Sequence, residues 1–166
     1  MDFRHLYTTF DGRINRKPFW MGAIVLFIVA FLVSLVVVGL LSMISQTLAS
    51  LVSLLISLVL LYPSCALGIK RLHDRGKSGR LMAVFIAPNV IFLIADMLGL
   101  TSRDVVMGGE TVPVPTALGG VLLLVSFVVA IWALIELGIR KGTPGPNAYG
   151  ADPLAPTPMT SDTNGV

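Results

Sequence analysis

The chain has 166 residues, of which 55% are apolar and only 13% are charged. Average soluble domains carry about a quarter charged residues, so a compact soluble domain of this length could not bury so much apolar surface. The net charge of +3 needs no nucleic-acid partner, because cytoplasmic loops of membrane proteins are themselves enriched in Lys and Arg.

The first long apolar tract follows a polar segment, residues 1–20, and predicts a membrane-spanning helix at about residues 21–44. It contains sixteen Leu, Ile, Val or Phe residues and no charge, and about 20 apolar residues suffice to span a bilayer. A second tract, at about residues 47–69, follows after only Ser45 and Gln46. One continuous helix through both tracts would be about 70 Å long, so we expect a tight helical hairpin.

Two further spans are predicted at about residues 81–100 and 117–138. The stretch between them, TSRDVVMGGETVPVPT, contains Gly108, Gly109 and two prolines, and these breakers predict a loop. The tail at residues 142–166 is rich in Pro and Gly. It has too little apolar surface to pay for ordering, so we expect its last dozen residues to be disordered.

The basic residues predict the orientation of these spans. Eleven of the twelve Lys and Arg residues lie in three islands, at residues 4–17, 70–80 and 140–141, and only Arg103 lies elsewhere. Alternating spans bring the three islands to one face, which the positive-inside rule assigns to the cytoplasm. The predicted fold is an all-α integral membrane bundle of four transmembrane helices, with both termini cytoplasmic and the transmembrane domain at residues 21–141.

Three segments at these islands carry a family resemblance. They read FDGRINRKPFW from Phe10, RLHDRGKSG from Arg71 and GTPGPNAYGADP from Gly142. Their order and placement, over roughly residues 5–154, resemble the bacterial inner-membrane family known as domain of unknown function 805. The resemblance implies a four-span, multi-pass protein of the bacterial inner (plasma) membrane and implies no activity. The chain departs from the family pattern at Arg80, where an aromatic residue, often Trp, is usual.

The first segment is typical of the start of a membrane helix. Pro18 suits the first helical turn, where its missing N–H costs nothing. Since a residue before proline avoids the α conformation, we expect Lys17 to be the N-cap. Phe19 and Trp20 then fall at the level of the lipid headgroups. The alternative to a functional role is that this segment only orients the first span.

The middle segment excludes a phosphate-binding loop and argues against catalysis and metal binding. A phosphate-binding loop needs Gly where Arg71 stands. His73 and Asp74 suggest acid–base chemistry, but no nucleophile stands at a defined distance, and they are too few to ligate a metal. We therefore expect no enzyme, no metal and no other cofactor. A lipid-headgroup enzyme acting through His73 and Asp74 is the third and weakest hypothesis.

A cytoplasmic polar cap is the leading interpretation. Gly76 and Gly79 can end the second helix, and each basic residue near an anionic membrane surface contributes about 1 kcal/mol. We expect the C-terminal segment to fold back onto the other two, so that Asp152 or Glu136 pairs with an arginine such as Arg75, Arg13 or Arg71. The candidate cap residues are Arg13, Asn15, Arg16, Arg71, His73, Asp74, Arg75, Lys77, Asn147, Tyr149 and Asp152.

Three polar residues inside the predicted spans are separate candidates, because ionisable groups in a membrane are often functional. Asn89 and Asp96 are seven residues apart and share a helix face. They would line a transport path, or they would bond neighbouring helices, with Asp96 meeting Arg103. Glu136 stands four residues before Arg140, within helical reach.

The expected function is that of a non-enzymatic binding or scaffold protein of unknown activity. Its basic cytoplasmic face would contact anionic lipid headgroups or a partner protein, a second copy of the chain included. The alternative is a small transporter or channel subunit that uses the Asn89–Asp96 face. No nucleic acid is expected as a partner.

Overall fold

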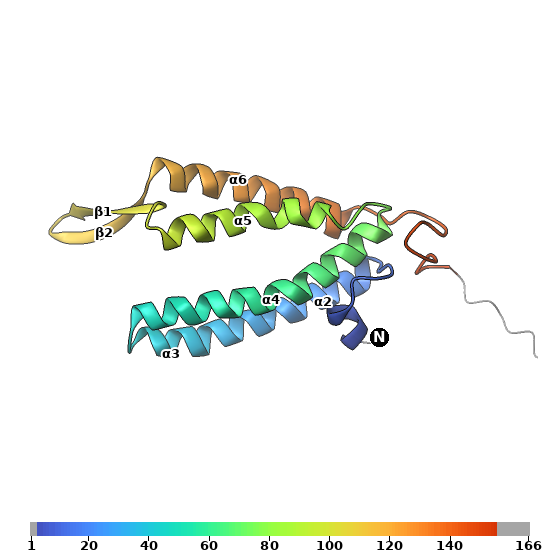
Figure 1. The fold of residues 1–166 in the computed structure, drawn as a ribbon, viewed down its shortest axis with the longest axis horizontal. Coiled ribbons are helices and arrows are strands. Elements are labelled where there is room, and N and C mark those ends of the chain that lie inside the picture. The colour runs from blue at the N-terminus through green and yellow to red at the C-terminus, as the bar shows by residue number, and fades with distance from the viewer. Residues whose placement is uncertain (1–2, 156–166) are drawn as a thin grey trace, which may run out of the picture.

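The computed structural model describes residues 3–155, which form two helical hairpins (Figure 1). In the first hairpin, α2 (Arg16–Val33) continues through a π-helical turn, η1 (Ser34–Val38), into α3 (Gly39–Ser42). After a short turn, α4 (Gln46–Asp74) packs back against α2 and α3. The tight hairpin predicted here is confirmed, and its turn is residues 43–45, because Gln46 already belongs to α4.

The second hairpin pairs α5 (Leu81–Met97) with α6 (Ala117–Ala133), which continues as the π-helical η2 (Leu134–Ile139). Between α5 and α6 lie two strands, β1 (Ser102–Met107) and β2 (Glu110–Pro115). The edge-to-face contact of Phe85 with Trp132, whose ring centroids are 5.1 Å apart, belongs to the packing of α5 on α6.

The stretch between α5 and α6, predicted as a loop, instead forms two paired strands. The strands pair in antiparallel register, with Met107 opposite Glu110. Gly108 and Gly109 close the turn at φ of 63° and 88°, the geometry that a two-residue hairpin turn favours. The prolines of β2 are tolerated, because each strand of a two-stranded sheet has a free edge. The fold is therefore mostly helical with a small sheet, and a strictly all-α class is incorrect.

Polar side chains cap the starts of the long helices. Asn15, Ser45 and Thr116 cap α2, α4 and α6, and each side-chain oxygen accepts a hydrogen bond from a first-turn N–H. The expectation that Lys17 caps α2 is wrong, since Asn15 has the extended backbone and accepts the N–H of Lys17 at 3.0 Å. Pro18 still lies in the first turn, where its missing N–H is harmless.

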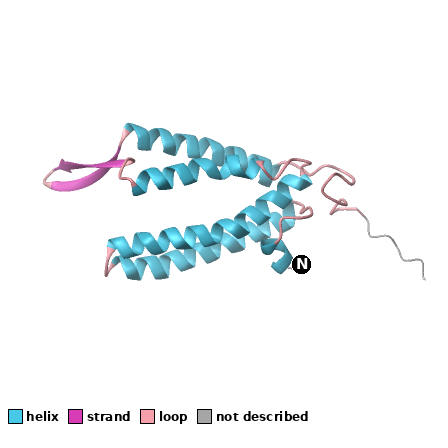
Figure 2. Cartoon of the chain, viewed as in Figure 1, coloured by secondary structure: helices cyan, strands magenta, loops and turns pink. Residues whose placement is uncertain are grey.

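The two hairpins meet at one end of the molecule and diverge toward the other, where β1 and β2 extend (Figures 1 and 2). At the shared end, Leu72 of α4, Phe85 of α5 and Leu137 of η2 form a buried apolar cluster. A second cluster, built on Leu6 and Leu67, packs the short helix α1 (Phe3–Thr8) against α4. The buried core thus lies beside the segments that carry the charges.

Within the described residues, three helical stretches are long and apolar enough to cross a membrane, namely Arg16–Ser42, Leu51–Asp74 and Ala117–Ile139. Helix α5 is a shorter apolar helix of 17 residues. Large apolar side chains point outward from these helices, as at Phe27, which is 69% exposed. Such surfaces suit contact with lipid. The disorder expected of the last dozen residues concerns a tail of which residues 156–166 lie outside those described.

Candidate functional site

The charged segments of the chain gather at the shared end of the hairpins (Figure 1). We call this region, made of residues 11–17, 70–80 and 136–154, the polar cap. It contains all eleven predicted cap residues, and it also contains Glu136, which the sequence placed in a separate group. The contacts below show that these three segments form one network.

Asp74, the last residue of α4, is the first centre of the network. Its Oδ1 accepts hydrogen bonds from Nε and Nη2 of Arg13, at 3.3 and 3.2 Å, and its Oδ2 pairs with Arg71 one turn earlier on α4. The three side chains are almost wholly buried, at 4% exposed or less. Buried charges are costly unless they are paired, so the carboxylate and the two guanidiniums depend on one another.

Glu136 of η2 is the second centre, and its side chain is 1% exposed. Oε1 accepts from Nε of Arg75 at 3.1 Å and lies 2.8 Å from Nζ of Lys77, while Oε2 accepts from Nη1 of Arg140 at 3.2 Å. The three cations are more exposed, at 17, 39 and 55%. One buried carboxylate therefore holds three cations from two segments.

The connection between α4 and α5 positions two of these cations, Arg75 and Lys77, next to Glu136. Gly76 has φ of +68°, and its N–H bonds the carbonyl of His73 while the N–H of Lys77 bonds that of Leu72. These two bonds define a Schellman motif, in which glycine takes the left-handed position after the helix. Arg75 and Lys77 therefore flank the reversal, and both reach Glu136.

Side chains of the other segments satisfy the carbonyls at the end of η2. The last carbonyls of a helix have no intrahelical partner and carry the negative end of its dipole. Arg71 donates to the carbonyls of Leu137, at 2.7 Å, and Arg140. Three further side chains donate to the neighbouring carbonyls. Trp20 donates to the carbonyl of Gly138 at 3.2 Å, Arg16 to that of Ile139 at 3.4 Å, and Arg75 to that of Lys141 at 2.6 Å.

Five consecutive carbonyls, from residue 137 to residue 141, are thus capped from α2 and from the end of α4. This arrangement explains why the three basic islands converge, because arginine carries several N–H donors that suit such a cluster of acceptors.

The segment after η2 folds back over Arg13. The guanidinium of Arg13 donates to the carbonyls of Thr143 at 2.7 Å, Gly145 at 2.8 Å and Gly150 at 3.2 Å. The N–H of Thr143 in turn bonds the carbonyl of Asp74 at 2.8 Å. Gly142 lies directly against the Asp74 carboxylate, with no space for a β-carbon.

A stack of two aromatic rings joins the C-terminal segment to the end of α4. The rings of His73 and Tyr149 stack with centroids 3.9 Å apart and planes 4° apart. Nδ1 of His73 lies 3.2 Å from the carbonyl oxygen of Gly12. Asn147 donates from Nδ2 to the carbonyl of His73 at 3.0 Å. His73 therefore joins all three segments.

Asp152 is bonded to backbone rather than to arginine. Its carboxylate accepts the N–H of Leu154 at 2.9 Å and that of Gly145 at 2.8 Å. These bonds, that of Leu154 above all, lower the pKa of Asp152 below its ordinary value. Of the acid–arginine pairs expected from the sequence, the structure contains Glu136 with Arg75, and Asp152 instead closes a turn of the C-terminal segment.

Sequence reasoning missed Lys70, which is fully buried. Its Nζ donates to the carbonyls of His5 and of Leu6, the latter at 3.1 Å, and so ties α1 to α4. Sequence reasoning also missed the partner of Arg13 and Arg71, since Asp74 was named as a cap residue and as a candidate acid or base but not as their counter-charge. The available signal was the spacing of Arg71 and Asp74, three residues apart on a helix.

Two of the predicted intramembrane residues lie outside the polar cap. Asp96 is exposed near the end of α5, and its carboxylate accepts the hydroxyl of Thr101 rather than meeting Arg103. Asn89 is exposed and lines, with Ser57, a pocket of about 310 Å³ between α4 and α5. The structure thus does not join Asn89 or Asp96 to the charged network.

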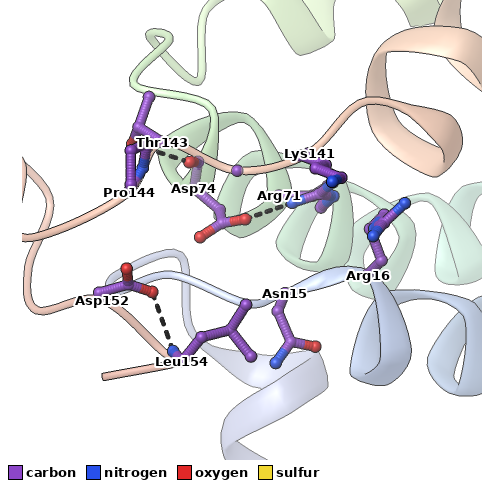
Figure 3. Close-up of a pocket in the computed structure, with 10 residues that line it drawn as sticks. Asn15, Arg16, Arg71, Asp74, Lys141, Thr143, Pro144, Asp152 and Leu154 are labelled. Atoms are coloured by element: carbon purple, nitrogen blue, oxygen red, sulfur yellow. Dashed lines mark hydrogen bonds and ion pairs between the residues drawn. The ribbon is translucent and has the colours of Figure 1, made fainter. Parts of the chain in front are cut away.

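A pocket of about 300 Å³ opens within the polar cap (Figure 3). Arg16, Arg71 and Lys141 lie at one end of it and Asp152 at the other. Among the described residues, Lys141 has no bonded partner for its ammonium group. Asp74 lines the pocket too, but its charge is already shared by two arginines. The cation-rich end can bind an anion, and no group of three metal-ligating side chains occurs among the described residues.

Comparison with known proteins agrees with the resemblance drawn from the motifs. The model of a family described as "Protein of unknown function (DUF805)" matches residues 7–151. "Uncharacterized protein YiiR" of Escherichia coli (strain K12) is 34% identical over 145 residues, which cover 87% of this chain and 85% of that protein. "Inner membrane protein YhaI" of the same strain is 31% identical over 88 residues, 53% of this chain and 70% of that protein. No solved structure gives a significant match.

Proposed function

The chain belongs to the DUF805 family, and from that premise we propose that it is a non-enzymatic, multi-pass inner-membrane protein. In this proposal the polar cap faces the cytoplasm and binds anionic phospholipid headgroups. The observation that carries the proposal is the charge balance of the cap. Its buried carboxylates, Asp74 and Glu136, are already neutralised within the protein. Exposed cations, Arg16 and Lys141 among them, remain at one end of the pocket (Figure 3).

The cytoplasmic orientation is supported by the distribution of basic residues. Eleven of the twelve Lys and Arg residues belong to the three islands, and the islands converge on one end of the molecule (Figure 1). The opposite end carries Arg103 in β1. Cytoplasmic loops are enriched in Lys and Arg, so the end with the polar cap is assigned to the cytoplasm. The relative YhaI is named an inner membrane protein, which supports the inner membrane as the location of this chain.

Four spans are proposed, with α5 as the third. Helix α5 has 17 residues, and is thus about 26 Å long at the usual helical rise. This is slightly less than the thickness of the hydrocarbon core, and the bilayer can thin locally to accommodate a short span. Helix α5 packs against α6, which is long enough to cross. The apolar residues Leu98 and Leu100 extend its outer end.

A non-enzymatic role is supported by the state of the two residues best suited to catalysis. Both oxygens of the Asp74 carboxylate are occupied by guanidiniums. One face of the His73 ring is covered by Tyr149, and its Nδ1 contacts the carbonyl of Gly12. These contacts occupy both carboxylate oxygens of Asp74 and one of the two ring nitrogens of His73, the groups that a general acid or base would use.

The alternative, a small transporter or channel subunit, has one observation in its favour. Asn89 and Ser57 give the pocket between α4 and α5 polar groups at the depth of the apolar helices. Flux through reconstituted protein that disappears with Asn89→Leu would support this alternative.

Two measurements test the proposed function. In a Cys65→Ser background, a membrane-impermeant maleimide applied to intact spheroplasts should label Glu110→Cys and leave Leu154→Cys unlabelled. Native mass spectrometry of protein released from nanodiscs of equal phosphatidylglycerol and phosphatidylcholine should show preferential retention of phosphatidylglycerol. Labelling at Leu154→Cys refutes the orientation, and equal retention of the two lipids refutes the binding role.

A further inference from the structure

We propose that the pocket of the polar cap and an apolar groove beneath it form one phospholipid site, with the phosphodiester held between Arg16 and Lys141 and one acyl chain in the groove. This inference rests on the proposed function, because it names where and how an anionic lipid is held. The groove has a volume of about 300 Å³ and lies between the two hairpins. It is lined by α2 and α4, with Met82 and Leu137 from the second hairpin.

On three elements, a residue that lines the pocket lies three or four positions from a residue that lines the groove. On α2, Arg16 lines the pocket and Phe19, one turn later, lines the groove. On α4, Arg71 lines the pocket and Gly68 lines the groove.

At the end of η2, Leu137 lines the groove, and Lys141, two residues after η2 ends, lines the pocket. Three or four residues make one helical turn, about 5 Å. Charged groups therefore stand directly above an apolar surface, as a phospholipid requires.

The cations at the pocket have donors left for a phosphate. Arg16 is exposed, and its one bond, to the carbonyl of Ile139, is long at 3.4 Å. Lys141 has no bonded partner for its ammonium group among the described residues. Arg71 also lines the pocket (Figure 3), but its guanidinium already bonds Asp74 and the carbonyls of Leu137 and Arg140. Charged N–H donors on phosphate oxygens make strong hydrogen bonds.

The groove favours a lipid over a free phosphate ion. Its lining is nearly all apolar, with Ala23, Ala30 and Gly68 leaving space beside Leu60 and Phe27. A soluble anion would use the pocket and leave this groove to unrelated bilayer lipid. A volume of about 300 Å³ is at the small end of ligand sites, and suits part of one acyl chain rather than a whole lipid.

Matched variants separate the two halves of the site. For the pocket, the double variant Arg16→Gln with Lys141→Gln is compared with Lys17→Gln and Arg80→Gln, which remove exposed cations that do not line it. For the groove, Ala30→Phe is compared with Val29→Phe, one residue away on the same helix and 45% exposed. A second groove pair is Leu60→Phe against Val59→Phe, which keeps the test usable if Ala30→Phe does not fold.

The measurement is native mass spectrometry of the full chain from nanodiscs of equal dioleoyl phosphatidylglycerol and dioleoyl phosphatidylcholine, with glycerol 3-phosphate as a soluble competitor. Wild type should retain one phosphatidylglycerol. The pocket double variant should lose retention by about fivefold for each cation removed, and both groove variants should lose it too. All four controls should match wild type, and glycerol 3-phosphate should compete poorly.

Two other outcomes overturn the inference in distinguishable ways. If the pocket variant lowers retention but neither groove variant does, and glycerol 3-phosphate competes fully, the site binds a soluble phosphate and the lipid site is rejected. In that case anion binding by the cap still stands. If wild type shows no preference for phosphatidylglycerol, the proposed function fails together with this inference.

Discussion

Asp74 and Arg13 are 61 residues apart in the chain, and two guanidinium nitrogens of Arg13 bond one carboxylate oxygen of Asp74, at 3.3 and 3.2 Å. The pair connects the segment before α2 to the end of α4. Since Arg13 also bonds three carbonyls of the C-terminal segment, this one contact joins all three parts of the polar cap.

Asp74→Asn should destabilise the protein strongly, because it leaves Arg13 and Arg71 buried without a counter-charge. Breaking a buried ion pair by removing one partner typically costs about 3–5 kcal/mol. Thermal unfolding in detergent, followed by circular dichroism, measures the change. Asp104→Asn on the exposed face of β1 is the control. Equal melting temperatures for the two variants would show that the ion pairs of Asp74 contribute nothing to stability.

The three cations that pair with Glu136 should contribute to the free energy of unfolding in the order of their burial. Glu136→Gln should be costly, whereas Arg140→Gln should change the free energy of unfolding by at most about 1 kcal/mol, since exposed pairs contribute little. Arg75→Gln should fall between them, because Arg75 is the least exposed of the three cations at 17%. Unfolding free energies of the single variants test the order. A larger loss for Arg140→Gln than for Arg75→Gln would contradict it.

Gly142→Ala should loosen the C-terminal segment. A β-carbon at this position would collide with the Asp74 carboxylate, which two arginines hold in place. Overpacking of this kind costs about 1–3 kcal/mol. Gly120→Ala on α6 is the matched control, since nothing lies within 4 Å of a β-carbon there. Faster proteolysis after residue 141 in Gly142→Ala alone would be the expected result, and identical cleavage of both variants would refute it.

Acid should release the turn closed by Asp152. The folded pKa of this carboxyl is lowered by the N–H groups of Leu154 and Gly145. A lowered folded pKa means stabilisation that is complete above the unfolded value, about 3.9 for Asp, and lost as the pH falls through the folded value. Hydrogen exchange at Gly145 and Leu154, corrected for intrinsic rates, should therefore lose protection below about pH 4. Asp152→Asn should lose the pH dependence, and an unchanged profile in that variant would assign it to another group.

The sequence predicted the family and the membrane character of the chain, because length, apolarity and charge are properties of segments. It missed the β1–β2 sheet because Gly108, Gly109 and the prolines of β2 are breakers in a helix but are acceptable in a hairpin turn and on a free strand edge. It placed Lys17 at the helix cap because backbone preference alone says nothing of the Asn15 side chain.

The candidate site was predicted as a set of residues but not as a set of contacts. The meeting of the three segments follows from the order of the helices, since two successive helical hairpins bring them to one end of the molecule. The roles of Asp74 and Glu136 depend on distances between elements, which charge patterns do not contain. The capping of the η2 carbonyls by Arg71, Arg16 and Trp20 involves backbone acceptors. Such acceptors are present at every residue and leave no mark in a sequence.

The most direct test of the account uses Trp20 as a reporter of lipid at the polar cap. Trp20 bonds the carbonyl of Gly138 and lies one turn after Arg16, and Trp132→Phe removes the other tryptophan of the chain. Brominated phosphatidylglycerol should quench Trp20 at a lower mole fraction than brominated phosphatidylcholine, and high salt should narrow the difference. Identical quenching curves for the two lipids at low salt would contradict the claim that the polar cap binds anionic headgroups.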